Sequence, residues 1–130
     1  MTDEEIQAIV NPFTNYCGIE IHKDERDGSY YLTAEWKPEY TNPYGYFHGG
    51  YLFTLADTTA GYNARRYTDG PVTLDCDFHY LNNAKAGKII CRAETIRTGR
   101  KILVFRVTIT SDTGKKLAEG TVSYYNTQEA

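Results

Sequence analysis

The second half of the chain is a series of segments in which apolar and polar residues alternate, and this pattern limits the possible folds more than any other feature. A two-residue period is typical of β-strands with one buried face. Turn-forming residues such as Ser111–Gly114 separate the segments. Strands joined by short turns pair in antiparallel fashion, so residues 72–125 are predicted to form an antiparallel sheet. The expected strands are 73–80, 88–97, 101–110 and 116–126.

A single long helix is predicted directly before these strands, from Tyr51 to about Arg66. Mostly small or apolar residues recur there at steps of three and four, which places them on one helical face. They are Leu52, Leu55, Ala56, Thr59, Ala60 and Asn63. Because this face needs a partner, we expect an α+β fold in which a curved antiparallel sheet packs against the helix.

Weaker signals precede the helix. Thr2 and Glu5 have the spacing of a capping box, which predicts an N-terminal helix over residues 2–10 that Asn11-Pro12 ends. Two further strands are expected over 18–22 and 30–37. No repeat or change of composition marks a boundary. We therefore expect one domain over residues 1–130, with its N-terminal helix within 1–12 and a tail at 127–130.

Composition and charge narrow the class of protein. Of the 130 residues, 41% are hydrophobic and 24% are charged, as in ordinary globular domains, and the net charge of −3 argues against a nucleic-acid partner. No apolar run approaches the ~20 residues of a membrane span. The N-terminus lacks the pattern of a signal peptide, and Cys17, Cys76 and Cys91 lack metal-ligand spacing. A cytoplasmic protein without a metal, a cofactor or a membrane partner is therefore expected.

The segment from Asn42 to Asp57 contains the residues with the clearest chemical potential. Gly49-Gly50 lies at the expected helix start, where free backbone N–H groups attract an anion or a polarised carbonyl oxygen. Asp57 lies on a helical face that is otherwise suited to burial, and a carboxylate there is costly unless it is paired or used. Each feature alone is commonly a tight turn or a solvated acid. Together with His48 and Asn42 they indicate a catalytic site.

Helix geometry adds a constraint on this site. Gly49 and Asp57 are eight residues apart, which is about 12 Å along a straight helix. Within one chain they cannot both reach one reacting carbon. If both act, Asp57 comes from a second subunit across a two-fold axis.

These residues resemble the signature of hotdog-fold acyl-CoA thioesterases of the phenylacetate-pathway type, within the hydroxybenzoyl-CoA thioesterase superfamily. The residues that carry the resemblance are Asn42-Pro43, Gly45, His48-Gly49-Gly50 and Leu55-Ala56-Asp57. Weaker similarity extends it over residues 13–126. The resemblance implies the hotdog fold, in which a sheet wraps around one long helix. It also implies homodimers, which often pair into homotetramers, and an acyl-CoA substrate.

The resemblance further implies roles for individual residues. The N–H of Gly49 would polarise the thioester carbonyl, and Asn42 would assist or orient it. Asp57 would be the general base or the nucleophile, and Thr73 would help to hold the attacking water. His48 would orient the site or stand near the leaving sulfur.

Binding of the substrate is expected to involve a second set of residues. Gly50 would line the substrate site next to Gly49. The nucleotide end of coenzyme A would lie at the surface, where Lys85, Arg100 and Lys101 are candidate phosphate partners. A thioester is already activated, so a positioned water, a base and an oxyanion site suffice for hydrolysis.

Two other functions remain open within the same fold. A hotdog hydratase or dehydratase would use a different arrangement of histidine and acid. A non-catalytic hotdog protein that binds acyl-CoA as a sensor or assembly module would keep the pocket, but it would not need Asp57. Thiol release from a panel of acyl-CoAs discriminates these functions. The acyl group itself stays open among aryl-acetyl, benzoyl and medium-chain groups.

Overall fold

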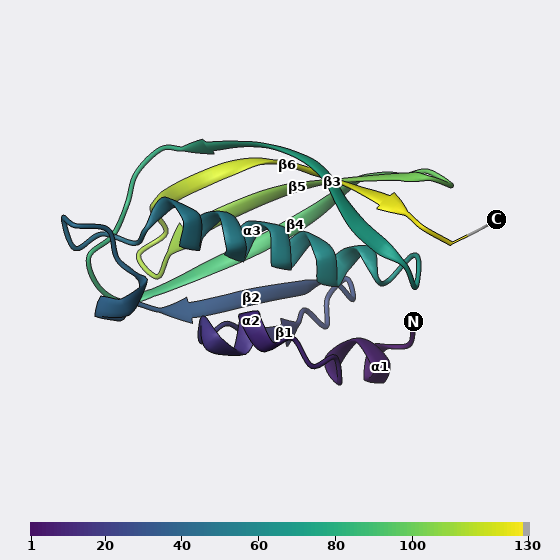
Figure 1. Ribbon diagram of the computed structural model, residues 1–130, viewed down its shortest axis with the longest axis horizontal. Helices are drawn as coiled ribbons and strands as arrows, with labels where there is room; N and C mark the ends of the chain where they lie inside the picture. Colours follow the sequence, from purple (N-terminus) through teal and green to yellow (C-terminus); the bar gives the residue numbers. More distant parts are fainter. Residues whose placement is uncertain (129–130) are drawn as a thin grey trace.

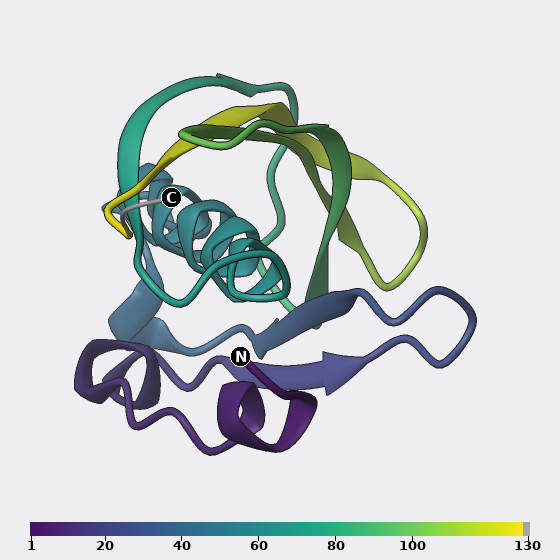
Figure 2. The ribbon, with the colours of Figure 1, turned by 90° about the vertical axis from the view of Figure 1, so that its right-hand side faces the viewer.

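One curved sheet wraps around α3 (Gly49–Ala64) in the computed structural model of the chain, which describes residues 1–128 (Figure 1). The sheet is antiparallel throughout, in the order β1-β2-β4-β5-β6-β3. Its strands are β1 (Glu20–Lys23), β2 (Tyr30–Glu35), β3 (Pro71–Tyr80), β4 (Lys88–Thr98), β5 (Ile102–Ser111) and β6 (Lys116–Asn126). Seen from the end, the sheet encloses α3, as Figure 2 shows. The predicted α+β architecture is confirmed.

The predicted apolar face of α3 packs against the sheet. Leu52, Leu55 and Ala60 are fully buried, and α3 contacts every strand from β2 to β6. The inward residues of β5 face the helix: Leu103, Phe105, Val107 and Ile109. Each large apolar side chain buried in this way contributes about 1.5–3 kcal/mol. This packing fixes the position of α3, and so of the site residues on it.

Asn63, the one amide on the buried face of α3, ties the helix to β2. Its Oδ1 accepts a hydrogen bond from the Tyr30 N–H at 2.9 Å, and its Nδ2 donates to the Tyr30 carbonyl at 2.9 Å. Tyr30 lies one residue before Tyr31, where the pairing of β2 with β4 begins. The Asn63 side chain therefore makes the two hydrogen bonds that a neighbouring strand would make to Tyr30, so the buried N–H and carbonyl of Tyr30 both have partners.

The N-terminal segment differs from its prediction. The capping box of Thr2 and Glu5 is present, but α1 (Asp3–Gln7) is short. Asn11-Pro12 does not simply end a helix, because it begins a second one, α2 (Pro12–Tyr16). The Asn11 side chain accepts a hydrogen bond from the Thr14 N–H, and proline is favoured at the first helical position. An Asn-Pro pair can both end one helix and begin the next.

A β-bulge at Leu74 changes the direction of the Thr73 side chain. Thr73 pairs with Tyr124 of β6, whereas the next residue in register is Asp75, opposite Ser123. Leu74 is thus an extra residue that shifts the phase of alternation by one. Unbroken alternation over residues 73–80 would place Thr73 and Cys76 on opposite faces of the sheet, and the bulge places both on the face toward α3. Thr73 reaches Asp57 of α3, while Cys76 packs against the same core.

The N-terminus and the end of β6 lie at the same end of the molecule (Figure 1). Of the predicted tail at 127–130, Thr127 bonds through its N–H to the Gly70 carbonyl. The last two positions, 129 and 130, lie outside the described residues. Among the helices of residues 1–128, none combines the length and the apolar character needed to cross a bilayer.

Candidate active site

His48 caps the N-terminus of α3. Its Nδ1 accepts a hydrogen bond from the Gly50 N–H at 2.8 Å, so the proton of the neutral ring lies on Nε2. The N–H groups of Tyr51 and Leu52 donate to the His48 carbonyl. Of the first helical residues, only Gly49 keeps an N–H without a partner within residues 1–128. Two free glycine N–H groups were expected at the start of the helix, but the Gly50 N–H is bonded to His48 and only that of Gly49 is free among the described residues.

Asn42 organises the loop that leads to this amide. Its Oδ1 accepts hydrogen bonds from the backbone N–H of Tyr44 at 2.9 Å and of Tyr46 at 3.2 Å. Gly45 between them has φ +86°, a conformation that favours glycine. The side-chain carbonyl of Asn42 is thus used to hold the turn, and Asn42 positions the backbone that enters α3.

A pocket of about 220 Å³ opens beside the start of α3. Aromatic side chains from α2, the 3₁₀ turn (Pro38–Tyr40) and α3 form much of its wall. The Tyr51 hydroxyl donates to the Cys17 carbonyl at 2.6 Å and fixes α2 against α3. The lining residues are Phe13, Tyr16, Cys17, Glu39, Tyr40, Thr41, His48, Gly50, Tyr51 and Thr54.

Asp57 lies two turns further along α3 and is half-buried. Only one oxygen of its carboxylate accepts hydrogen bonds from the described residues. Oδ1 accepts a hydrogen bond from the Thr73 hydroxyl at 2.8 Å and lies 2.7 Å from the Tyr124 hydroxyl. Oδ2 accepts none within residues 1–128. Burial, together with the charge of Asp57, raises the pKa of the Tyr124 phenol. The phenol therefore stays protonated and is a donor at physiological pH.

A second pocket, of about 270 Å³, lies over this carboxylate. It is lined by Asn11, Asp57, Thr58, Gly61, Tyr62, Arg65, Pro71, Val72, Thr73 and Tyr124. It shares no residue with the pocket beside His48. One chain thus carries two separate half-sites: a free amide with an aromatic pocket, and a carboxylate with its hydrogen-bond donors.

Comparison with known proteins identifies the family. The model of the Thioesterase superfamily matches residues 44–118, which is more than half of the chain and includes Gly49, Asp57 and Thr73. The chain belongs to the Thioesterase superfamily. The prediction from the sequence motif is confirmed, and the family assignment supports a thioester hydrolase.

Individual relatives agree with this assignment. The chain is 30% identical over 103 residues to the 1,4-dihydroxy-2-naphthoyl-CoA hydrolase of Listeria monocytogenes, across 77% of this chain and 83% of that one. A hypothetical thioesterase from Streptococcus pneumoniae, solved with coenzyme A, is 31% identical with a TM-score of 0.78 over 85% of this chain and 87% of its own.

A variant of the phenylacetic acid degradation protein PaaI from Thermus thermophilus is 25% identical, with a TM-score of 0.81 over 89% of this chain and 99% of its own. The fold of this thioesterase superfamily member is therefore the hotdog fold.

The cationic residues expected near coenzyme A lie at opposite ends of the sheet. Lys85 precedes β4, its Nζ lies 4.5 Å from the centre of the Tyr46 ring, and the adjacent Ala84 bonds to the loop before α3. Arg100 and Lys101 follow the far end of β4, and the Lys101 Nζ donates to the Gln128 carbonyl at 3.0 Å. A strand of this length separates the two groups by roughly 30 Å.

Two contacts at the site involve tyrosines to which the sequence alone gave no role. Tyr124 bonds to Asp57, and the Tyr80 hydroxyl donates to the Gly49 carbonyl at 3.0 Å. Both lie on strands that pair with each other but are far from α3 in sequence. A chain with twelve tyrosines gives no local signal that separates these two from the rest.

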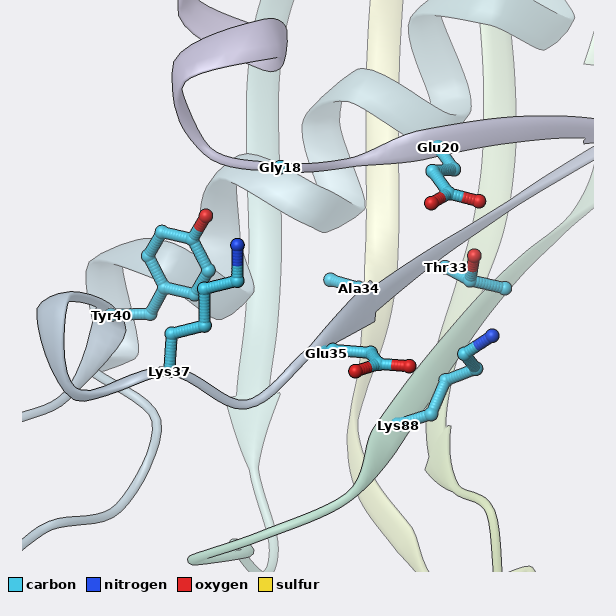
Figure 3. A pocket seen from close by; sticks show the side chains of 8 residues that line it. All are labelled: Gly18, Glu20, Thr33, Ala34, Glu35, Lys37, Tyr40 and Lys88. Carbon is cyan, nitrogen blue, oxygen red and sulfur yellow. The ribbon is translucent and has the colours of Figure 1, made fainter.

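A third pocket, of about 270 Å³, lies at the edge of β1 and β2 (Figure 3). Its charged residues are Glu20, Glu35, Lys37 and Lys88, and in Figure 3 Tyr40 stands on the side away from Lys88. It brings together none of the predicted site residues, so it is not the candidate active site.

Proposed function

We propose that this protein hydrolyses acyl-CoA thioesters through an active site that two copies of the chain build together. The observation that carries the proposal is the pairing of a free helix N-terminal amide, Gly49, with a carboxylate held by hydroxyl donors, Asp57. These are the groups that hydrolysis of an activated ester requires: an oxyanion donor and a base.

The reaction follows from these two groups. Water attacks the thioester carbon while Asp57 takes its proton, and the carbonyl oxygen becomes an oxyanion that bonds to the Gly49 N–H. Collapse of this intermediate expels coenzyme A as its thiolate. The Nε2–H of His48, beside Gly49, is a donor for the leaving sulfur or for the acyl carbonyl. If Asp57 attacks directly instead, water hydrolyses the resulting anhydride in a second step.

The need for a second copy comes from the separation of the half-sites. Gly49 and Asp57 lie on one continuous helix, and the pocket beside the start of α3 shares no residue with the pocket over Asp57. A two-fold axis between antiparallel α3 helices brings Gly49 of one copy to Asp57 of the other, and generates two sites in each dimer.

An exposed apolar surface beside α3 supports this assembly. β3 is an edge strand of the sheet, and large apolar side chains gather along it and on the adjacent α3. They are Phe53, Val72, Leu74 and Tyr80, which are 37%, 49%, 54% and 51% exposed. An unpaired edge strand with apolar neighbours is a natural site for pairing with a second copy.

The same two-fold arrangement suggests where coenzyme A binds. In antiparallel helices, the C-terminal end of α3 in the second copy extends past Gly49 of the first. Arg100 and Lys101 lie at that end of the fold, because the Lys101 carbonyl accepts a hydrogen bond from Asn126 and the adjacent Thr127 bonds to Gly70, which follows α3. They would then approach Lys85 of the first copy and form one cationic surface for the phosphates. The aromatic pocket beside His48 is left for the acyl group.

The activity is tested by measuring thiol release from aryl-acetyl, benzoyl and medium-chain acyl-CoAs. Turnover of at least one of them is expected. If the chain binds acyl-CoA but releases no thiol from any, the non-catalytic alternative replaces this proposal.

The composite site is tested with two inactive variants in one dimer. Gly49→Pro removes the free N–H at the first helical position, where proline is well tolerated, and the preceding His48 has the extended conformation (φ −63°, ψ 138°) that proline requires. A mixed dimer of Gly49→Pro and Asp57→Asn chains contains one site with both groups intact and one with neither.

The mixed dimer should recover about half of the wild-type activity, although each homodimer is nearly inactive. Gly49→Ala is the matched control, since it keeps the N–H, and a Cβ there lies no closer than 3.5 Å to the Tyr80 ring. Absence of recovery in a well-folded mixed dimer would show that each site lies within one chain.

A further inference from the structure

Tyr124 is the donor to Asp57 with no assigned role. It lies on β6 with only 5% of its surface exposed. Its hydroxyl is 2.7 Å from Asp57 Oδ1 and 2.6 Å from the Asp57 backbone carbonyl. The ring packs edge-on against Phe105, with ring centres 6.4 Å apart. The phenol is therefore held in place from both ends.

The sequence of α3 makes room for this phenol. Gly61 follows Asp57 by one helical turn, and a Cβ built on it would lie 2.8 Å from the Tyr124 hydroxyl oxygen. This is closer than side chains pack, so any larger residue at position 61 would push the hydroxyl away from Asp57. The carbon that bears the hydroxyl would be 3.5 Å away, an ordinary contact. The space that Gly61 leaves is thus specific to the oxygen of a tyrosine.

The two donors act on the same carboxylate oxygen. Thr73 and Tyr124 both approach Oδ1, while Oδ2 accepts no hydrogen bond within residues 1–128. A carboxylate with one oxygen held in this way has a fixed plane and a defined free oxygen. General base catalysis depends on such geometry, because proton transfer requires an oxygen at hydrogen-bond distance from the water.

We infer that Tyr124 is a positioning residue, which together with Gly61 holds Asp57 so that Oδ2 is the oxygen that meets the attacking water or the thioester. This inference rests on the proposed function. It adds a residue from β6 to a site whose other members come from α3, the loop before α3 and β3.

Tyr124→Phe tests the inference, because it removes only the hydroxyl. The kcat on the best acyl-CoA substrate should fall by about 10- to 100-fold, as expected when a catalytic group loses its orientation. The KM should change by less than about 3-fold, since the Tyr124 hydroxyl bonds to Asp57 and the groups proposed to bind the substrate are unchanged.

Tyr30→Phe is the matched control. Tyr30 is also a buried tyrosine, 2% exposed, whose hydroxyl donates to a carboxylate, that of Asp3 near the N-terminus. This variant removes an equivalent hydrogen bond outside the site. It should melt lower, as Tyr124→Phe does, yet keep its kcat. Equal kcat losses in both variants would mean that Tyr124 acts through stability alone.

Gly61→Ala supplies an independent test. Alanine stabilises a helix interior relative to glycine, so a loss of activity cannot come from a weaker helix. Gly61→Ala alone should lower kcat in the same range as Tyr124→Phe. The double variant should be no worse than Tyr124→Phe, because the oxygen that clashes with the new methyl group is gone. If the kcat losses of the two single variants multiply in the double variant, Gly61 does not act through Tyr124.

The outcomes separate this inference from the proposed function. A wild-type protein that hydrolyses no acyl-CoA overturns the proposed function. An active wild type whose Tyr124→Phe variant keeps its full kcat overturns only the role of Tyr124.

Discussion

Replacement of Asp57 by asparagine should remove most of the hydrolytic activity while the fold is kept. The Asn side chain has nearly the same shape and volume, and its Oδ1 can still accept the hydrogen bonds from Thr73 and Tyr124. It cannot take a proton from water or attack a carbonyl carbon. The substitution therefore separates the chemistry of the carboxylate from its structural contacts.

The two effects differ in size. Hydrogen bonds to a neutral acceptor are about half as strong as those to a carboxylate, so the loss of stability is about 1–2 kcal/mol. This is small beside the 5–15 kcal/mol that holds a typical domain together, and it lowers the Tm by only a few degrees. Loss of a general base costs about 10²–10⁴ in rate, or roughly 3–5 kcal/mol of barrier. The Gly49 half-site is unchanged, so the KM should stay within a few-fold of wild type.

The assay compares kcat for wild type and Asp57→Asn on the best thioester, with thermal melting and light scattering on the same samples. A folded variant with the wild-type assembly state that retains more than about a tenth of kcat, a barrier change below ~1.4 kcal/mol, would refute the assignment. In that case Asp57 is a structural carboxylate. The same light-scattering measurement should find at least a dimer, and a monodisperse active monomer would refute the composite site.

Three further predictions concern the residues around the two half-sites. His48→Asn should keep the helix cap and the Tm but lower kcat. His48→Ala should lower kcat and also lose the cap, with about 1 kcal/mol of stability; melting curves and kcat measurements distinguish the two variants. Asn63→Ala should destabilise the fold by roughly 2–5 kcal/mol, because it leaves two buried backbone groups of Tyr30 without partners; denaturant unfolding measures this, with the exposed Asn15→Ala as control. Replacement of Arg100 and Lys101 together by Ala should raise the KM for full-length acyl-CoA more than it lowers kcat, and an unchanged KM would mean that the nucleotide binds elsewhere.

The local sequence was sufficient to predict the long helix and the last three strands. It was also sufficient to predict the half-site at Gly49, which lies within one continuous segment. The period of α3 predicted its buried face, including Asn63. The period of two predicted β6 at the residues where it is observed, and β4 and β5 to within one residue at each end. The step from loop to helix at Gly49 depends on residues adjacent in the chain, His48 and Gly50, so local rules describe it well. The family motif also lies within this continuous stretch.

Contacts between distant segments decided the rest. Which oxygen of Asp57 is held depends on Thr73 and Tyr124, and these approach only because the sheet curves over α3. The bulge at Leu74 aims Thr73 at the carboxylate, and one inserted residue leaves no mark on an alternating pattern. The space beside Gly61 has meaning only when the Tyr124 hydroxyl occupies it. Periodicity reports which face of an element is buried, but the partner that each buried group meets is set by how the faces are brought together in space.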